Sequence, residues 1–394
     1  MDCAASSSPR RPSFELADIA RAHGEAFRRS HALTADQAAV MRDIVRCRTA
    51  ALGGHLDVCD QCGDTTPSYN SCRNRHCPKC QGLAQAKWIA EREERILPVR
   101  HFHVVFTMPS ELHALTQYRR ELLFDMLFAC AGQTLLELGR DERHLGATLG
   151  LTTVLHTWTR ALLFHPHIHC IVTGGGLCLD GGRWIDSRRK YLFPVKVMGA
   201  LFRGKFLDRL RKAHARAEFA GFDRFDDPEA FERLMSALAR KDWVVYAKRA
   251  FGGAEQVYRY LGRYTHRVGI ANSRLVALRD DAVTFRTKSG KAITVTPGEF
   301  LRRFLLHVLP ARFVKMRHFG LLASGNVPTK LEQARALLSS RSPSTTATSP
   351  SGRDIVAALT VDEIRHCPRC GVGILRRGPI PLDWTPTVAA LDSS

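Results

Sequence analysis

The chain has 394 residues, of which 45% are hydrophobic and 24% charged. This length suits two or three domains, and the composition excludes a mostly disordered or fibrous protein. Lysines and arginines number 58 against 38 acidic residues, and the resulting net charge of +20 favours nucleic acid over an anionic membrane surface as partner. No apolar run approaches the ~18 residues that cross a bilayer, and residues 1–16 lack the apolar core of a signal peptide. We therefore expect a cytoplasmic protein without a membrane partner.

The first hundred residues combine a helical segment with a cysteine-rich module. Apolar and charged positions alternate at helical spacing over 14–45, and Thr34 to Gln37 have the form of a capping box that opens a second helix. Residues 47–80 are rich in Cys, His, Gly, Asn and Arg, which is typical of a small module held by metal. A charged helix is expected over 83–96.

The longer part that follows alternates β-rich and helical stretches. Strands are expected at 103–108, 152–158, 167–173 and 243–248, and helices at 110–140, 196–210, 227–239, 254–267 and 299–308. The glycines at 174–176 are expected to end the third strand. Ser289-Gly290 is expected to turn a hairpin between 282–287 and 292–296. Residues 339–352 are mostly Ser, Thr, Pro and Gly, the composition of a flexible linker.

Six of the twelve cysteines lie between Cys47 and Cys80, and this clustering predicts reduced thiolates that hold metal. Two Cys-x-x-Cys pairs have zinc-ribbon spacing and are expected to share one tetrahedral Zn²⁺. Those pairs are Cys59 with Cys62 and Cys77 with Cys80. The remaining ligand types in this stretch, which could hold a second ion, are Cys47, His55, Cys72 and His76. A closed four-ligand shell makes such ions structural.

Basic residues stand between these ligands. Arg73, Arg75 and Lys79 are expected to project outward from a rigid module, where they would contact phosphates or only keep the module soluble. A last pair, Cys367-x-x-Cys370 with His366 beside it, supplies only two or three ligands. It could pair with another chain, with cysteines elsewhere in this chain, or bind nothing.

Two further features carry chemistry. His167-Ile168-His169 lies in a β-rich stretch, so that both imidazoles share one face and can bind one divalent ion; His165 is a lesser candidate. Tyr260 and Tyr264 lie four residues apart and share a face of the expected helix. The tyrosines could be an aromatic packing pair, but three arginines among them suit phosphate chemistry instead. These arginines are Arg259, Arg263 and Arg267.

A phenol with a pKa near ~10 is a poor nucleophile at neutral pH. It can attack a phosphodiester if a metal ion polarises the phosphate and basic groups stabilise the developing charge. Two histidines and a tyrosine therefore predict a site that nicks a single DNA strand. The product would be a 5′-phosphotyrosine and a free 3′-hydroxyl, and a second tyrosine would allow a second cut.

Four stretches of the chain together resemble the rolling-circle transposases of the IS91 group, which belong to the His-hydrophobe-His nucleases. They read CRTAALGGHLDVCDQCG…YNSCRNRHCPKCQ over 47–81, HFHVVFTMPSEL, LHTWTRALLFHPHIHCIVTGGGL and YRYLGRYTHRVGIANSRL. The resemblance implies that His167 and His169 hold catalytic Mg²⁺ or Mn²⁺ and that Tyr260 and Tyr264 are the nucleophiles. The third metal ligand stays open between Gln256 and His103. The implied partners are single-stranded DNA at insertion-sequence ends and target DNA.

The expected fold is α+β, with a small N-terminal zinc-binding module followed by a nuclease domain whose central antiparallel sheet is flanked by helices. We expect an N-terminal helical segment at 1–46, the zinc-binding domain at 47–97, the nuclease domain at 98–337, the linker at 338–352 and a C-terminal tail at 353–394. A relaxase or replication initiator would share the same chemistry. A zinc-dependent DNA-binding regulator, whose tyrosines only pack, is the alternative without catalysis.

Overall fold

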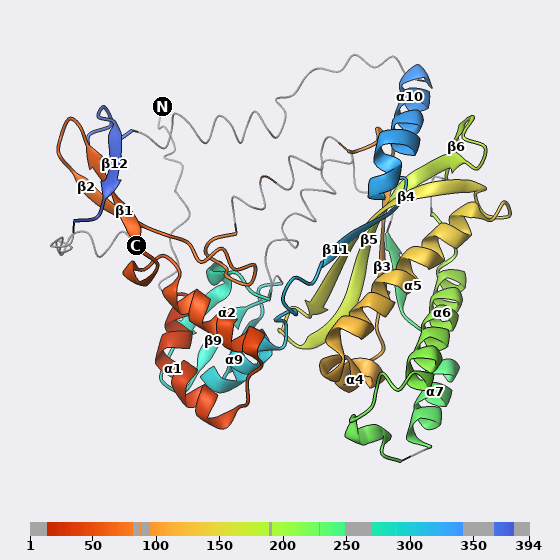
Figure 1. Cartoon of the computed structure of the whole chain (residues 1–394), viewed down its shortest axis with the longest axis horizontal. Coiled ribbons are helices and arrows are strands. Elements are labelled where there is room, and N and C mark those ends of the chain that lie inside the picture. Colours follow the sequence, from red (N-terminus) through yellow and green to blue (C-terminus); the bar gives the residue numbers. More distant parts are fainter. Residues whose placement is uncertain are drawn as a thin grey trace.

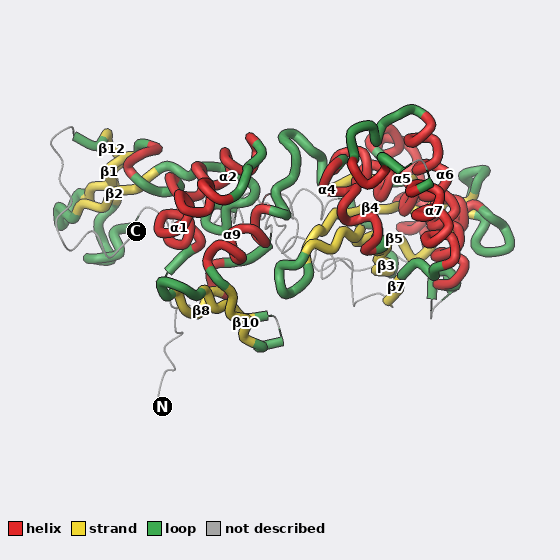
Figure 2. The backbone as a smooth tube through the Cα atoms, turned by 90° about the horizontal axis from the view of Figure 1, so that it is seen from below, coloured by secondary structure: helices red, strands yellow, loops and turns green. Residues whose placement is uncertain are grey.

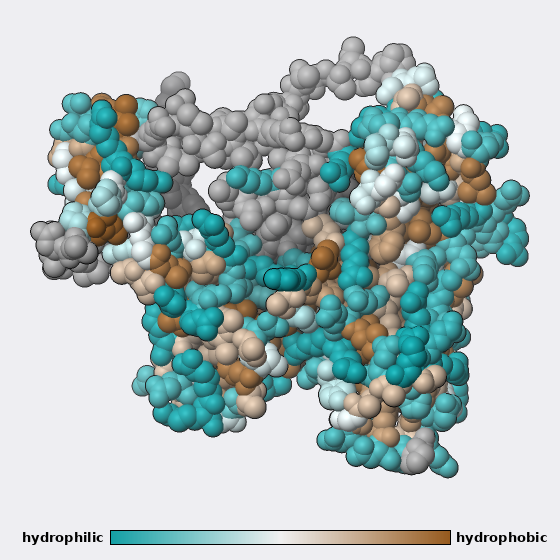
Figure 3. Space-filling model, in the orientation of Figure 1, coloured by the Kyte–Doolittle hydropathy of each residue, from teal (hydrophilic) through white to brown (hydrophobic). Residues whose placement is uncertain are grey.

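The computed structural model of the chain describes residues 14–81, 87, 95–188, 191–227, 229–248, 269–287, 289–341 and 366–381. Figures 1 and 2 show two lobes, one built around a long sheet and one of helices with a small sheet, and a small ribbon of strands beyond the second lobe. Figure 3 shows a largely hydrophilic face, with the lower parts of the two lobes separate. Most of the expected helix at 83–96 and all of that at 254–267 lie outside the described residues.

The larger lobe contains a six-stranded antiparallel sheet, as expected. Its strand order is β11-β4-β5-β3-β7, and β6 pairs with the far end of β5. The strands are β3 (His101–Thr107), β4 (Ala147–Trp158), β5 (Phe164–Cys178), β6 (Trp184–Asp186), β7 (Val245–Lys248) and β11 (Met316–Gly320). The two longest strands, β4 and β5, pair along most of their length at the centre of this sheet.

Helices pack against one face of this sheet (Figure 1). They are α4 (His113–Tyr118), α5 (Arg120–Arg140), α6 (Val195–Ala215) and α7 (Ala230–Arg240). Alternation along β3 and β5 turns Phe102, Val104, Ile168 and Cys170 toward them, and these residues share one buried core with the apolar side chains of α5 and α6. Among the described helices only α5 has the length and hydropathy to cross a membrane, and 67% of that window is buried inside the protein.

The glycines at 174–176 do not end the strand, contrary to expectation, because β5 continues to Cys178. A Cβ on Gly174 would lie 2.6 Å from the Arg100 carbonyl oxygen, and one on Gly176 would lie 2.5 Å from that of Thr148. Glycine is therefore required here because neighbouring backbone approaches closely, not because the chain must turn.

The second lobe is built from the N-terminal helices and from a later segment of the chain. Helices α1 (Leu16–Ser30) and α2 (Ala35–Arg46) pack with α9 (Pro297–Leu305) around one core, which also takes side chains from a three-stranded sheet. That sheet contains β8 (Leu275–Leu278), β9 (Val283–Arg286) and β10 (Ala292–Val295), and its β9–β10 hairpin is the expected one. The expected capping box of α2 is confirmed, since the Thr34 side chain accepts from the Gln37 amide and the Gln37 side chain accepts from Thr34.

The ribbon at the edge of the molecule is built from distant parts of the chain. It contains β1 (Gly54–Cys59), β2 (Thr65–Tyr69) and β12 (Leu375–Pro379), in the order β12-β1-β2. Helix α10 (Glu332–Arg341) packs near β6 at the far end of the larger lobe (Figure 1). Short helical turns occur at Ala50–Leu52, Ser110–Leu112, Asp223–Phe225, Asn272–Arg274, Ser324–Asn326 and Val327–Leu331.

Candidate active site and cysteine groups

The face of the large sheet opposite the helices carries the histidines. His167 and His169 project from β5 on this face, as alternation predicts, and His156 projects beside them from β4, where it pairs with His167 in register. One ring nitrogen from each of the three lies within 4.8 Å of one from each of the others. We call His156, His167 and His169 the histidine cluster.

The rings of the histidine cluster converge. The ring centroid of His156 lies 4.2 Å from that of His169 and 5.5 Å from that of His167, and those of His167 and His169 are 4.9 Å apart. Nδ1 of His167 is 2.7 Å from the His165 carbonyl oxygen, to which it donates. This bond fixes the ring and leaves Nε2 of His167 with its lone pair, as in metal-binding histidines.

His103 supports the histidine cluster from the neighbouring strand β3. Its Nε2 lies 2.7 Å from Nδ1 of His169, and the two rings stack at 8° with centroids 5.0 Å apart. A proton on Nδ1 of His169, donated to His103, leaves Nε2 of His169 available as a ligand. His103 therefore lies where it can orient a ligand, whereas His156 completes the cluster.

Burial lowers the pKa of three of these imidazoles, those of His103, His156 and His167. Desolvation lowers the pKa of His167 to about 4 and that of His103 to about 4. Desolvation, followed by the proximity of His169 and His167, lowers the pKa of His156 well below its ordinary value. A neutral imidazole is the form that binds a metal ion, so His156 and His167 have the protonation state of metal ligands near neutral pH.

The sequence alone gave no reason to select His156. No spacing relates it to the pair on β5, and only the register between β4 and β5 brings the three together. Gln256, the other candidate for third ligand, lies outside the described residues. The same holds for both tyrosines, Tyr260 and Tyr264, and for the three arginines beside them, Arg259, Arg263 and Arg267.

The sheet nevertheless shows where the tyrosine-bearing segment starts. The strand β7 ends at Lys248, which pairs in register with His103. The chain therefore enters residues 249–268 from a point directly beside the residue that contacts His169.

The cysteines divide into groups that differ from the expected ones. Four of them, here called the buried cysteine group, come from the end of α2 and from the loop that follows the ribbon: Cys47, Cys72, Cys77 and Cys80. The Sγ atoms of Cys72 and Cys80 are 3.7 Å apart, and the Cys72 amide donates to Sγ of Cys47 at 3.5 Å. A tetrahedral Zn²⁺ with Zn–S bonds of ~2.3 Å requires S···S distances of ~3.8 Å; the Cys72–Cys80 pair meets this distance, and all four sulfurs lie within 4.8 Å of one another.

Cys59 and Cys62 do not join Cys77 and Cys80, because β1 carries them away from the second lobe into the ribbon. They lie with Cys367 and Cys370 of the tail, and we call these four the split cysteine group. The last pair, Cys367 with Cys370, therefore lies beside cysteines elsewhere in the same chain, which is one of the alternatives left open by the sequence.

Neither histidine of this module belongs to a cysteine group. His55 lies on β1 with Nε2 3.7 Å from the Asp57 carboxylate. His76 is buried, its Nε2 accepts from the Leu309 amide at 3.2 Å and its Nδ1 lies 3.1 Å from the Asn74 side-chain oxygen. Both ring nitrogens of His76 lie within hydrogen-bonding distance of groups in the protein, and His55 faces a carboxylate, so the structure places neither expected ligand with the cysteines.

Two of the three basic residues near these ligands point inward, contrary to expectation. Arg75 donates to the carbonyls of Phe313 at 2.6 Å and Pro310 at 3.2 Å, and Lys79 pairs with Glu15 at 2.7 Å. Only Arg73 is exposed. Arg75 and Lys79 thus fasten the module to the rest of the second lobe.

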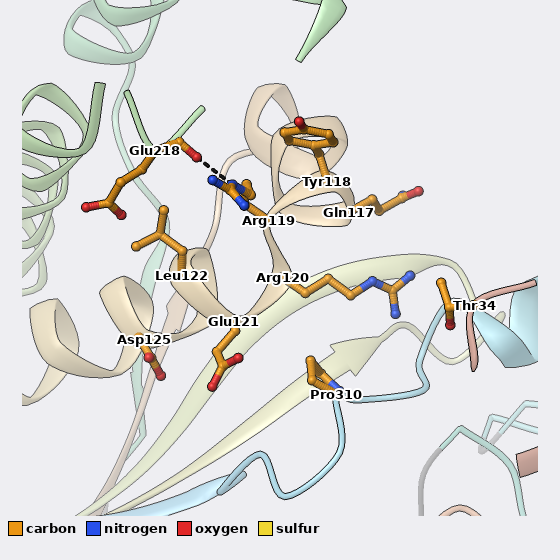
Figure 4. A pocket seen from close by; sticks show the side chains of 10 residues that line it. All are labelled: Thr34, Gln117, Tyr118, Arg119, Arg120, Glu121, Leu122, Asp125, Glu218 and Pro310. Carbon is orange, nitrogen blue, oxygen red and sulfur yellow. Dashed lines mark hydrogen bonds between the residues drawn. The ribbon is translucent and has the colours of Figure 1, made fainter. Parts of the chain in front are cut away.

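An open cavity of about 600 Å³ lies near the junction of the two lobes, where Arg120 reaches from α5 toward Thr34 and Pro310 (Figure 4). The Arg119 guanidinium donates to the Glu218 carbonyl oxygen at its rim. Acidic and basic side chains line it together, and no member of the histidine cluster does. The cavity is therefore separate from the candidate active site.

Comparison with known proteins defines the class of protein. Residues 150–330, which contain the histidine cluster, match the family model described as putative transposase. Residues 19–108, which contain the buried cysteine group, match the one described as transposase zinc-binding domain. The architecture is thus that of a DNA-acting transposase with an N-terminal zinc-binding domain.

Two relatives are similar over most of their length. The chain is 45% identical over 371 residues to the putative transposase y4qJ of Sinorhizobium fredii, covering 91% of this chain and 93% of the relative. It is 28% identical over 347 residues to the transposase for insertion sequence element IS801 of Pseudomonas savastanoi pv. phaseolicola, covering 83% and 80%. The chain belongs to the IS91 family of transposases.

Proposed function

We propose that this transposase nicks single-stranded ends of its insertion sequence with a tyrosine nucleophile and a metal ion bound by His156, His167 and His169. The convergence of these three ring nitrogens on one sheet face carries the proposal. We propose His156 as the third ligand, in place of the two candidates from the sequence, Gln256 and His103. His103 orients His169 instead.

The ligand set fits a divalent cation. Desolvation lowers the pKa of His156 and of His167, and His167 and His169 are each oriented through their Nδ1 atoms. Mg²⁺ prefers oxygen ligands, so three nitrogen ligands favour Mn²⁺ of the two expected ions. When bound, the ion would polarise the scissile phosphate and offset the charge that develops on it.

Tyr260 and Tyr264 are the proposed nucleophiles. In each cut the phenolic oxygen forms a bond to phosphorus, the bond to the 3′ oxygen breaks, and the phenolic proton is lost while the 3′ oxygen gains one. The 5′-phosphotyrosine conserves the energy of the phosphodiester, so that a later attack by a 3′-hydroxyl can transfer the strand. The start of this segment beside His103 supports the assignment.

The partner that follows is single-stranded DNA, first at the element ends and then at the target. Arg73 on the zinc module and Arg259, Arg263 and Arg267 beside the tyrosines are proposed to contact its phosphates. Because Arg75 and Lys79 bond to other groups within the protein, we do not include them among the proposed DNA contacts.

The test is a labelled single strand that carries an end of the element, incubated with the full chain and Mn²⁺. A covalent protein–DNA adduct should form, and it should be lost in the double variant Tyr260→Phe, Tyr264→Phe and in His156→Ala. The matched control is His144→Ala, which removes a histidine of the same lobe that lies outside the cluster. Adducts that survive in the double tyrosine variant would overturn the proposal.

A further inference from the structure

The two Cys-x-x-Cys turns of the split cysteine group have the same backbone geometry. In the first, the Cys59 carbonyl accepts from the Gly63 amide at 3.1 Å; in the second, that of Cys367 accepts from Gly371 at 2.9 Å. Both glycines are left-handed, with φ of 66° and 72°. The sequence Cys-x-x-Cys-Gly thus occurs twice, starting at Cys59 and at Cys367, which are 308 residues apart. Both copies form the same turn.

The four thiols of the split cysteine group face one another across these turns. Sγ of Cys59 is 3.7 Å from that of Cys370, and Sγ of Cys62 is 3.7 Å from that of Cys367. The cysteines are free thiols, and both distances equal the Cys72–Cys80 separation in the buried cysteine group. They match the ~3.8 Å edge of a tetrahedron with Zn–S bonds of ~2.3 Å.

Backbone amides point at the sulfurs, as the thiolate form requires. The Cys62 amide donates to Sγ of Cys59 at 3.5 Å, and the Gly373 amide donates to Sγ of Cys370 at 3.3 Å. A Cβ on Gly373 would lie 2.3 Å from Sγ of Cys59. Glycine at 373 therefore allows the tail to approach this sulfur.

Strand pairing brings the tail to this position independently of the thiols. β12 pairs antiparallel with β1 from His55–Pro379 to Cys59–Leu375, and Asp60 exchanges two hydrogen bonds with Ile374. Arg377 also contacts Asp57, with Nε 3.0 Å from the carboxylate. The C-terminal tail thus contributes a paired strand to the ribbon.

We propose that Cys59, Cys62, Cys367 and Cys370 bind a second structural zinc ion, which joins the C-terminal tail to the N-terminal zinc-binding domain. Its four thiolate ligands leave no open position, so the ion has no catalytic part. The family match for the zinc-binding domain ends at residue 108, and the tail supplies half of this site from outside it. The proposal does not depend on the nicking chemistry, because its readout is zinc content.

The first experiment measures zinc per chain by native mass spectrometry of the full-length monomer. Besides the ion at the histidine cluster, the wild type should hold two zinc ions, one in each cysteine group, and the variant with both Cys367→Ser and Cys370→Ser should hold one. Val372→Ser is the matched control, since this residue lies in the same turn, is 74% exposed and offers no thiol; it should hold two. Two zinc ions retained in the double cysteine variant would overturn the proposal.

A second experiment needs no variant and so stands even if the double variant does not fold. The zinc-loaded wild type is treated with iodoacetamide, with and without a chelator, and cysteine modification is read peptide by peptide. Cys62 is exposed and Cys370 half-buried, so both should react fast if no metal holds them. Protection of Cys59, Cys62, Cys367 and Cys370 that chelation removes supports the site. Equal rates with and without zinc contradict it.

Discussion

Nε2 of His103 on β3 lies 2.7 Å from Nδ1 of His169 on β5, with the two rings within 8° of parallel. The bond joins neighbouring strands at the histidine cluster and fixes the nitrogen that His169 presents. We propose that His103 is a positioning residue. Its removal should therefore weaken metal binding without removing a ligand.

We expect His103→Ala to raise the Mn²⁺ concentration needed for half-maximal nicking by about 10- to 100-fold, with a smaller change in the rate at saturating Mn²⁺. His103→Gln, whose side-chain oxygen can accept from His169, should restore part of the affinity. The Mn²⁺ dependence of adduct formation measures both. An unchanged Mn²⁺ requirement in His103→Ala would exclude the positioning role.

A second prediction concerns the attachment of the zinc module. Arg75 donates to two carbonyls of the segment that precedes β11, those of Phe313 and Pro310, and burial lowers its pKa. Arg75→Lys keeps the charge but cannot make both bonds in the same geometry, and we expect a loss of about 2 kcal/mol of stability. Arg73→Lys, at an exposed position, is the control and should change urea-unfolding midpoints little.

A third prediction follows from the close approach of strands β4 and β5 at Gly176. Gly176→Ala places a Cβ against the Thr148 carbonyl at 2.5 Å and should cost about 2 kcal/mol or more. Gly204 lies in α6 with nothing within 4 Å of an added Cβ, so Gly204→Ala should stabilise by about 0.5–1 kcal/mol. Thermal unfolding of the two variants should shift in opposite directions, and a shift of Gly176→Ala upward would contradict the packing.

The pH dependence of stability gives a fourth prediction. His307 is fully buried between the Thr157 hydroxyl and the Leu162 carbonyl. Desolvation lowers its pKa to about 4; the hydrogen bond to the Leu162 carbonyl opposes this shift, and the nearby Arg120 charge adds to it. The unfolded chain protonates this ring near pH 6.5 and the folded chain only near 4, so stability is lost as pH falls from 6.5 to 4, by about 3 kcal/mol for this group.

Other buried histidines titrate in the same range, so the test compares the loss of stability in the wild type with that in a His307 variant. His307→Gln keeps a donor toward the Leu162 carbonyl and removes the titration. Urea unfolding at pH 7 and pH 4.5 should show a smaller loss in His307→Gln than in the wild type. The same loss of stability in both proteins would show that groups other than His307 cause the pH dependence.

The sequence predicts those parts of the site that depend on local periodicity. Alternation places His167 and His169 on one face, and the hairpin turn at Ser289-Gly290 is correctly predicted because its signal is local. His156 could not be predicted, because only pairing between β4 and β5 brings it to the others. The tyrosine helix at 254–267 stays a prediction.

The cysteine grouping shows where spacing misleads. Cys77-x-x-Cys80 is near Cys59-x-x-Cys62 in sequence, but the partners of the latter lie in the tail. One signal distinguishes the pairs: glycine follows Cys62 and Cys370, whereas Gln81 follows Cys80. The left-handed turn that glycine permits is common to the two knuckles that meet.

The pairing of β12 with β1 also sets an order of events during synthesis. β1 is the central strand of the ribbon, and Cys62 and Cys367 are separated by 305 residues. At ~5–20 residues per second the ribosome needs about 15–60 s to cover that distance. Throughout this time one edge of β1 is without its partner, so the ribbon is the last part of the described structure to close, and a chain released before residue 375 leaves with that strand edge open to another molecule.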